Sequence, residues 1–463
     1  MQPTMAAVGI RSFGARLERV FRAATPDPFV LAILLTAVTG GLALAATSAT
    51  AVEVLDAWQG PRGFWGLLSF SMQMCLVLVT GHALASAPVA TSAIAQLVRL
   101  PKTGPGAAAL VAFVSIATSL VNWGLALIVG ALLAREMGRC AEQRGLRVHY
   151  PLLVAAGYAG LMTWHGGFSG SAPLKVTTQK DLLEMLPAHL AQGLTPVSTF
   201  ETLLSPLNLV ATGGLLLLVP LIVARLSPKA GEDARSFSQC TQAPLEAPDL
   251  LPPGTTWAER LQSSRWVTAL LVLPLVASLV VYFGRHGVSR LDPNAVNLTL
   301  LTLGLLAHGR PVAYARAVGR AVQGCTGIIL QFPLYGGIMG IMAGTGLAKL
   351  VAGWAASTGS SSAYLVFTFL SAGLLNFFVP SGGGQWAVQG PIAVEAASQL
   401  GVPLSSAVMA VAYGDEWSNM LQPFWALPLL GITGVKAGDI MGYTATIMLL
   451  SGLWFVGALL LLG

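Results

Sequence analysis

Charged side chains are scarce in this sequence. Asp, Glu, Lys and Arg make up 10% of the 463 residues, whereas hydrophobic residues make up 54%. A soluble domain carries about 25% charged residues, so this composition excludes an ordinary soluble protein. The basic residues lie between long apolar runs, where they indicate the side of the membrane that each loop occupies. We therefore expect a multi-pass protein in a lipid bilayer, with no nucleic-acid partner despite a net charge of +6.

Cysteine and enzyme signatures are also scarce. The four Cys residues have no spacing typical of a metal site, so we expect neither a disulfide nor a cysteine metal centre. The nucleotide-binding pattern G-x-x-x-x-G-K-[ST] is missing, which argues against direct coupling to nucleotide hydrolysis. The pattern G-x-S-x-G is missing too, which argues against a serine hydrolase. We expect no enzyme and no cofactor other than a coupling ion.

The apolar runs predict two similar units. A transmembrane helix needs about 20 apolar residues. The first unit, residues 28–225, is expected to hold spans at 28–46 and 66–87, a hairpin at about 106–134, a broken helix at about 151–173 and a last span at 203–223. A polar linker at 226–265 and a connecting span at 266–284 follow. The same order returns in residues 293–463, with a hairpin at about 362–397 and a broken helix at about 404–423.

Basic residues predict the sidedness of these elements. Residues 1–27 resemble a basic amphipathic segment on the cytoplasmic surface. Basic residues flank both ends of the run 106–134, which a single crossing cannot arrange, so we expect a re-entrant hairpin with Asn122 at its tip. One long tilted helix is the alternative. The single connecting span inverts the second unit, and inverted repeats with paired broken helices are typical of secondary transporters.

The stretch 379–386 is the most unusual part of the sequence because it is glycine-rich and lies between two apolar runs. Backbone freed from a helix at membrane depth must be buried in protein or line a cavity. Glycines let amide groups approach a ligand, and helix N-termini favour anions. We expect a carboxylate to bind at the breaks, with these candidate residues: Asn122, Trp123, Gly124, His165, Ser169, Gly170, Ser171, Asn376, Ser381, Gly382, Gly383, Gly384, Gln385 and Asn419.

Acidic residues at membrane depth are costly and are therefore functional candidates. Asp415 and Glu416 lie in the second broken helix, and we expect them to serve ion coupling together with Asn122 and Asn376. Either Na+ at the hairpin tips or a proton on Glu416 fits this pattern. Alternatively, Asp415 and Glu416 are helix-end charges at the membrane surface. His165 is a candidate donor to the substrate or a pH-dependent element, with a packing role as the alternative.

Several stretches resemble one known family in collinear order. They are PDP at 26–28, FSMQM at 70–74, VTGHALAS at 79–86, VNWG at 121–124, GGFSGS at 166–171, VPSGGG at 379–384 and QPFWALP at 422–428. The sequence resembles the bacterial short-chain fatty acid transporter family, within the broader ion transporter superfamily. It departs from the family's pattern at His165, Gln385 and Asp415.

This resemblance implies an activity and an assembly. The activity is uptake of acetoacetate, butyrate and similar monocarboxylates across the cytoplasmic (inner) membrane of a bacterium. The superfamily implies an elevator-type motion of the hairpins against a scaffold, in a homodimer. A carrier for other organic anions such as dicarboxylates is the first alternative. A passive channel is another, as is an acyl hydrolase or transferase that would use Ser169 or Ser381 as nucleophile and His165 as base.

Overall fold

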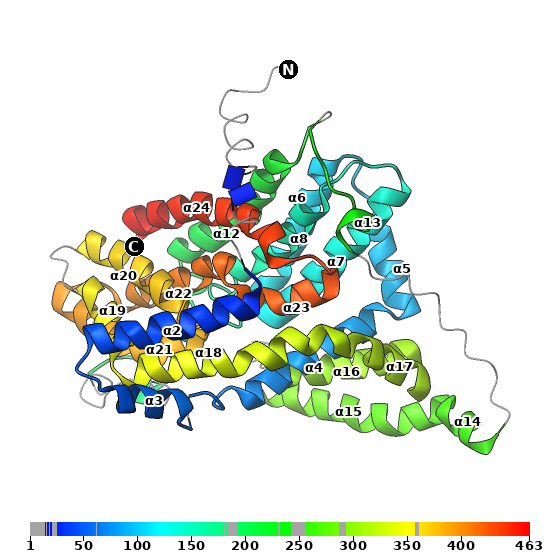
Figure 1. The fold of residues 1–463 in the computed structure, drawn as a ribbon, viewed down its shortest axis with the longest axis horizontal. Helices are drawn as coiled ribbons and strands as arrows, with labels where there is room; N and C mark the ends of the chain where they lie inside the picture. The colour runs from blue at the N-terminus through cyan, green and yellow to red at the C-terminus, as the bar shows by residue number, and fades with distance from the viewer. Residues whose placement is uncertain are drawn as a thin grey trace.

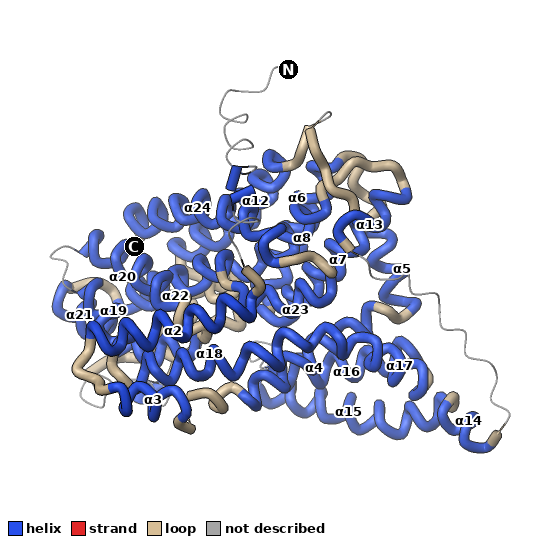
Figure 2. Tube along the Cα trace, in the orientation of Figure 1, coloured by secondary structure: helices blue, strands red, loops and turns tan. Residues whose placement is uncertain are grey.

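A computed structural model describes residues 26–61, 63–179, 193–229, 232–241, 256–286, 293–356 and 361–463, with isolated positions before residue 26 and at 182–183. Every regular element in this part of the chain is a helix (Figure 2). Six described helical segments are long and apolar enough to cross a membrane. The prediction of an all-helical fold with several apolar spans is therefore confirmed. The predicted segment 1–27 lies almost entirely outside the described residues.

The described helices include long apolar ones and shorter ones. Those before the middle of the chain are α2 (Pro28–Ala46), α3 (Ala51–Gln59), α4 (Leu68–Ala85), α5 (Pro88–Leu97), α6 (Gly104–Val121), α7 (Trp123–Gln143), α8 (Tyr150–Tyr158), η1 (Ala159–Met162), α9 (Ser171–Leu174) and α12 (Pro206–Leu226). The linker region 226–265 contains α13 (Phe237–Cys240) and α14 (Trp257–Gln262), and α15 (Arg265–His286) is the connecting helix. The remaining helices are α16 (Pro293–His308), α17 (Pro311–Ala321), η2 (Val322–Cys325), α18 (Thr326–Gly344), α19 (Leu347–Ala356), α20 (Ser361–Asn376), α21 (Gly382–Leu400), α22 (Leu404–Ser418), η3 (Asn419–Leu421), α23 (Pro423–Thr433) and α24 (Ala437–Leu462).

Four short helices stand where the sequence predicts loops or leaves the region undefined: α3, α5, α17 and α19. Helix α3 forms directly after the first apolar helix, where charged residues interrupt the apolar pattern of the sequence. Its start is fixed by a capping box in which Thr50 Oγ1 accepts the Glu53 amide and Glu53 accepts the Thr50 amide. Glu53 and Asp56 interrupt the apolar residues of α3, so the helix has no apolar run that hydropathy could detect.

Helices of the two halves pack across each other. In Figure 1, α2 lies along α18, and α4 lies beside α16. Gln73 on α4 donates to Asn294 Oδ1 at 2.9 Å, and Asn297 on α16 donates to the Gln73 carbonyl at 3.0 Å. Helix α18 also packs closely on α3, because a Cβ at Gly340 of α18 would lie 2.3 Å from the Ala57 carbonyl oxygen of α3. The close packing therefore joins segments that lie far apart in the sequence.

Two helix pairs fold back on themselves. Helices α6 and α7 meet at Asn122, and a Cβ at Gly130 would lie 2.9 Å from Ser115 Oγ on the opposite helix. At the open end of this pair, Arg144 donates to the carbonyl oxygens of Val98 (3.2 Å) and Pro101 (3.1 Å), which precede α6. The chain thus enters and leaves this hairpin on one side.

The second hairpin is formed by α20 and α21. Near its open end, the Tyr364 hydroxyl on α20 donates to the Ala393 carbonyl oxygen on α21 at 2.6 Å. Both hairpins therefore point their closed ends, residues 122 and 377–381, into the protein.

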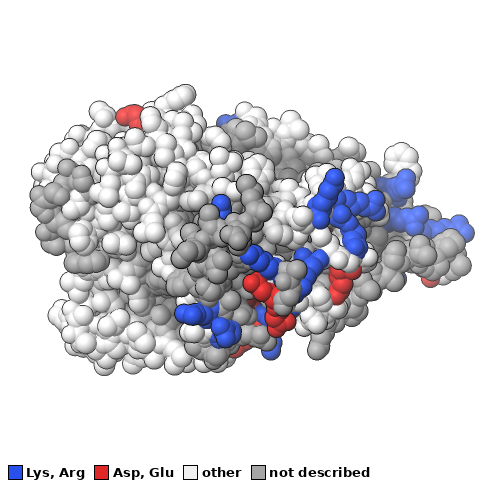
Figure 3. Space-filling model, turned by 90° about the horizontal axis from the view of Figure 1, so that it is seen from above, with Lys and Arg blue, Asp and Glu red and all other residues white. Residues whose placement is uncertain are grey.

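Charge is unevenly spread over the surface. Figure 3 shows Lys and Arg gathered towards one end of the face drawn there, with the acidic residues mostly beside them. Over the rest of this face the described residues are almost all uncharged. A surface without charged groups suits contact with lipid.

Candidate functional site

The first broken helix opens into a tight turn between η1 and α9. A Cβ at Gly170 would lie 2.1 Å from the His165 carbonyl oxygen, and one at Gly167 would lie 2.6 Å from the Leu120 carbonyl oxygen. Backbone contacts this close leave no room for a side chain. We call residues 163–171 the first break. Close packing therefore requires glycine within it.

The tip of the first hairpin rests on this first break. The Phe168 amide donates to the Leu120 carbonyl at 2.8 Å, and the Trp123 amide donates to Ser169 Oγ at 3.1 Å. Asn122 is buried and acts as the N-cap of α7, because its Oδ1 accepts the Leu125 amide at 3.0 Å. Ser169 and Asn122 thus hold the N-terminus of α7 in place.

The tip of the second hairpin reaches the same break from the other side. Ser381 caps α21 by accepting the Gly384 amide at 3.2 Å. A Cβ at Gly382 would lie 2.6 Å from the Trp164 ring and 2.9 Å from His165 Cε1. Within the described part of the chain, the amides of Gly382 and Gly383 donate no hydrogen bond. The α21 N-terminus therefore presents unpaired N–H groups, which favour an anion.

His165 joins the first break to α22. Its Nδ1 lies 2.5 Å from Asp415 Oδ2, and its Nε2 accepts the Ala172 amide at 2.9 Å. A ring nitrogen that accepts an N–H carries no hydrogen itself. His165 is therefore the neutral tautomer with hydrogen on Nδ1, which donates to the Asp415 carboxylate.

Glu416 binds the backbone of the same break. Its Oε2 accepts the amides of His165 at 2.6 Å and Gly166 at 3.1 Å, while its Oε1 has no hydrogen-bond partner. Asp415 is 1% exposed and Glu416 is fully buried. The alternative that both are helix-end charges at a surface is therefore wrong, because both side chains are buried and bond to residues of the first break.

Asn376 holds the second broken helix, α22–η3–α23. Its Nδ2 lies 2.7 Å from the Asp415 carbonyl oxygen, 2.9 Å from Ser418 Oγ and 2.8 Å from Asn419 Oδ1. Gln422 donates in turn to the Asn376 carbonyl. Asn376 and Asn419 thus bond to each other within the protein, and this network fixes the end of α22.

Gln385 lies inside the second hairpin. Its Nε2 donates to the Ala372 carbonyl at 2.9 Å and to Gln389 Oε1 at 3.1 Å, and its side chain is fully buried. Of the other predicted residues, Gly124 follows the first tip, while Ser171 Oγ lies 3.9 Å from the Cβ position of Gly383. The structure therefore brings all four breaks together, with Gln385 one turn behind the second tip.

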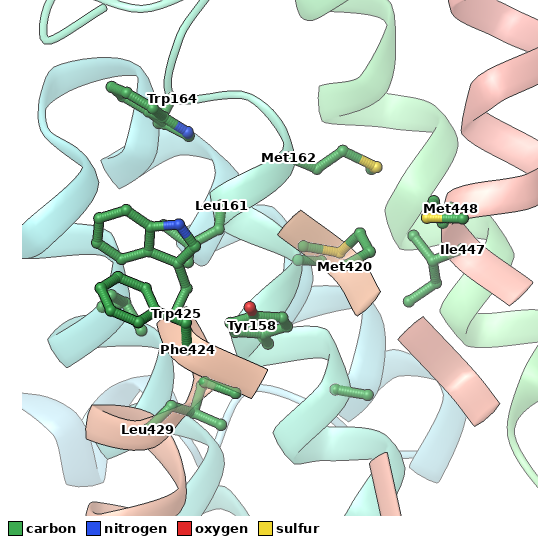
Figure 4. Packing of buried hydrophobic residues seen from close by; sticks show 14 of the residues in the cluster. Tyr158, Leu161, Met162, Trp164, Met420, Phe424, Trp425, Leu429, Ile447 and Met448 are labelled. Carbon is green, nitrogen blue, oxygen red and sulfur yellow. The ribbon is translucent and has the colours of Figure 1, made fainter. Parts of the chain in front are cut away.

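An aromatic cluster lies beside these tips. Trp123 is 6.4 Å from Trp164 and 5.1 Å from Trp425, measured between ring centroids. Phe424 lies 5.0 Å from Trp425 and 4.2 Å from Phe332 of α18. In Figure 4, Trp425 lies between Trp164 and Phe424. The cluster provides an apolar wall next to the polar tips.

A cavity of about 1400 Å³ opens near the N-terminus of α2 and the start of α24. Its lining includes Gln331 and Leu427, which lie next to Phe332 and one turn beyond Phe424. Gln331 is buried and its Oε1 has no hydrogen-bond partner. The cavity therefore extends close to the aromatic cluster.

The sequence prediction missed Asn208 on α12. Its Nδ2 donates to the Gly166 carbonyl at 2.8 Å, while its Oδ1 accepts the hydroxyls of Thr212 (2.7 Å) and Tyr413 (3.1 Å). This network supports the first break from outside the hairpins. The available signal was an Asn next to an apolar run, directly after the Ser205–Pro206 helix start.

Apolar helices long enough to cross a membrane, together with four helix interruptions that meet inside the protein, define a multi-pass membrane protein of the transporter class. The chain belongs to the short-chain fatty acid transporter family, whose model matches residues 9–462. The family and the relatives below are transporters, which confirms that the protein is not an enzyme.

The chain is 41% identical over 431 residues to an Escherichia coli (strain K12) protein provisionally named short-chain fatty acid transporter, covering 93% of this chain and 95% of the relative. It is 38% identical over 438 residues to a Haemophilus influenzae protein of the same provisional name, with the same shares covered.

Two solved structures align over nearly the whole chain. The YdaH transporter of Alcanivorax borkumensis aligns with a TM-score of 0.41, 18% identity and coverage of 94% of this chain and 97% of that one. MtrF of Neisseria gonorrhoeae, described as illuminating a class of antimetabolite efflux pumps, aligns with a TM-score of 0.40, 15% identity and 96% coverage of both.

Proposed function

We propose that the protein is a secondary active transporter that imports short-chain monocarboxylates, such as acetoacetate and butyrate, across the bacterial cytoplasmic membrane. Uptake is coupled to Na+ or H+ through Asp415, Glu416 and the hairpin-tip residues Asn122 and Asn376. The single observation that carries this proposal is the pair of unpaired amides at Gly382 and Gly383 beside an aromatic wall. The names of the two relatives at 38% and 41% identity support the substrate class.

The arrangement of donors and rings suits a small carboxylate with a short acyl chain. The carboxylate would accept the amides of Gly382 and Gly383, with Ser171 nearby, and the chain would lie against Trp164 and Trp123. Among the described residues, no Arg or Lys forms an ion pair at the tips. Neutral donors hold a monoanion weakly enough for release, whereas a dicarboxylate carrier would need compensation for a second charge.

Inverted repeats are the architecture that we propose for this activity. The order α2, α4, hairpin, broken helix and α12 is matched by α16, α18, hairpin, broken helix and α24. Packing between the halves supports this architecture. Helix α2 of the first half packs on α18 of the second, and α16, the counterpart of α2, packs on α4, the counterpart of α18. We further propose an elevator-type movement of the hairpins, a homodimeric assembly and a cytoplasmic N-terminus.

Uptake into proteoliposomes tests this proposal. Purified protein is reconstituted, and accumulation of radiolabelled butyrate is measured under an imposed Na+ gradient, an imposed pH gradient, both, or neither. We expect saturable accumulation above the external concentration under at least one gradient, because coupled transport works against the substrate gradient. Unlabelled acetoacetate should compete and succinate should not.

Three outcomes would contradict the proposal. Equilibration without accumulation would indicate a passive channel. Stronger competition by succinate than by acetoacetate would indicate a carrier for dicarboxylates. Failure of preloaded unlabelled butyrate to drive counterflow of labelled butyrate, in the absence of any ion gradient, would exclude monocarboxylate transport altogether.

A further inference from the structure

Helix α15, which connects the two halves of the chain, is the least covered of the six described segments that are long and apolar enough to cross a membrane. Only 11% of its most apolar stretch is buried in the protein, against 17–61% in the other five. Figure 1 shows α15 at the edge of the bundle, alongside α16. Most of its surface is therefore available to the surrounding membrane.

The most exposed apolar residues of α15 lie on one helical face. They follow one another at intervals of four, three and seven residues: Trp266, Leu270, Leu273 and Val280. Such spacing forms a stripe along an α-helix. At 1.5 Å per residue the stripe is about 21 Å long, which exceeds the roughly 15 Å depth of the hydrocarbon in one leaflet. The stripe is therefore long enough to accommodate the acyl chains of a lipid.

Two arginines meet at the Trp266 end of this stripe. Arg265 is the first residue of α15, and Arg310 directly precedes α17. Arg265 Nε lies 3.8 Å from the Cβ position of Gly309, whose carbonyl accepts Thr268 Oγ1 at 3.2 Å. Both arginines are exposed, and neither side chain forms an ion pair or a hydrogen bond in the part of the chain that the structure describes. Their guanidinium groups are therefore available to phosphate oxygens, which they match in geometry.

The surroundings of the two arginines are basic as well. Residues 257–266 and 308–320 contain five Arg and one acidic residue, Glu259. Glu259 Oε2 accepts the Thr256 amide at 2.9 Å, so this carboxylate is held in the capping box of α14. Helices α14 and α17 lie at the right-hand end in Figure 1, and Lys and Arg gather at the same end in Figure 3. The region therefore carries a net positive charge that suits an anionic partner.

We propose that Arg265 and Arg310 bind the phosphate group of an anionic phospholipid whose acyl chains lie along the exposed stripe of α15. Charge and apolar length together select this partner. A free phosphate ion or an acidic protein segment would match the arginines but would leave the stripe unused. Trp266 lies beside the arginines, at the level where head groups meet hydrocarbon and where indole rings are favoured. The site is built from α15 and the α16–α17 turn, so the proposal goes beyond monocarboxylate transport and does not depend on it.

Native mass spectrometry of the full-length protein in detergent tests this site. Phosphatidylglycerol or phosphatidylcholine with the same acyl chains is added at increasing concentration, and the Kd of the first bound lipid is determined. We expect the wild-type protein to bind phosphatidylglycerol at least about tenfold more tightly than phosphatidylcholine, because arginines near the membrane surface attract anionic lipids. The double variant Arg265→Gln/Arg310→Gln should lose this preference.

A charge-matched variant distinguishes a defined site from general attraction. Arg99→Gln/Lys102→Gln removes the same charge from exposed positions between α5 and α6, and it should bind phosphatidylglycerol as the wild-type protein does. Equal affinity of the wild-type protein for the two lipids would overturn the proposal, and so would an equal loss in the two double variants. Displacement of phosphatidylglycerol by millimolar inorganic phosphate would replace the lipid site by an ion site. Tighter binding of a polyglutamate peptide than of phosphatidylglycerol would replace it by a docking site for an acidic protein segment.

Discussion

At the scale of single residues, the contact of Gly382 with Trp164 and His165 fixes the position of the second hairpin tip. Three glycines stand in a row at residues 382–384, but their surroundings differ. The Cβ position of Gly382 is 2.6 Å from Trp164, whereas that of Gly383 has only Ser171 Oγ near it, at 3.9 Å. Two adjacent positions of the same tip therefore have opposite tolerance to an added methyl group.

We predict that Gly382→Ala lowers the kcat/KM of butyrate uptake at least about tenfold, because overpacking of about 1–3 kcal/mol displaces the tip from the first break. Gly383→Ala keeps the amide and should lose less than about threefold. Initial uptake rates over a range of butyrate concentrations measure both. Equal losses in the two variants would mean that glycine flexibility, rather than contact with Trp164, matters at this tip.

At the scale of helices, the first hairpin depends on one close crossing. A Cβ at Gly130 on α7 would lie 2.1 Å from the Gly157 carbonyl oxygen on α8, and Ser115 of α6 donates to that same oxygen at 2.6 Å. Three helices therefore meet where one carbonyl group is shared. Backbone atoms cannot move aside as a flexible side chain can.

We predict that Gly130→Ala lowers the stability of the protein in detergent by about 1–3 kcal/mol, because the methyl group forces α7 away from α8. Gly213→Ala on α12 is the matched control, since no atom lies within 4 Å of its Cβ position. Thermal unfolding followed by tryptophan fluorescence compares the two. A similar melting temperature for both variants would show that the crossing can relax.

Three of the breaks could be proposed from the sequence because they are marked by residues that a helix tolerates poorly. The glycines of 166–170 and 382–384 are of this kind, as is Pro423. The depth of Asp415 and Glu416 could not be predicted, because their partners at His165 and Gly166 lie about 250 positions earlier and no local pattern records such contacts. The short helix α3 was also missed, since its nine residues are too few for a span and its packing partners on α18, such as Gly340, lie far away in the sequence.

At the scale of the whole molecule, sidedness is the property most open to a direct test. Arg144 at the end of α7 bonds to the carbonyls of Val98 and Pro101, so both ends of the first hairpin lie on one side. The half-buried Cys140 lies one turn before Arg144 on α7, whereas the exposed Gln59 ends α3, which follows the single span α2. The proposed topology places these two positions on opposite sides of the membrane.

We predict that a membrane-impermeant maleimide labels Cys140 in inside-out vesicles and not in intact cells, when the other cysteines are replaced. Gln59→Cys in a cysteine-free background should show the reverse pattern. Mass-shift labelling on a gel measures both. Labelling of the two positions from the same side would contradict the proposed topology with a cytoplasmic N-terminus.

The packing of first-half helices on second-half helices has a consequence for biosynthesis. Gln73 of α4 meets its partner Asn294 only after 221 further positions of chain. At a synthesis rate of about 5–20 residues per second, α4 waits in the membrane for roughly 10–45 s with its amide side chain unmatched. During that time the nascent first half carries a polar side chain that is hydrogen-bonded to the second half in the finished protein. The ribosome and its insertion machinery must therefore shelter an incomplete scaffold until the second half arrives.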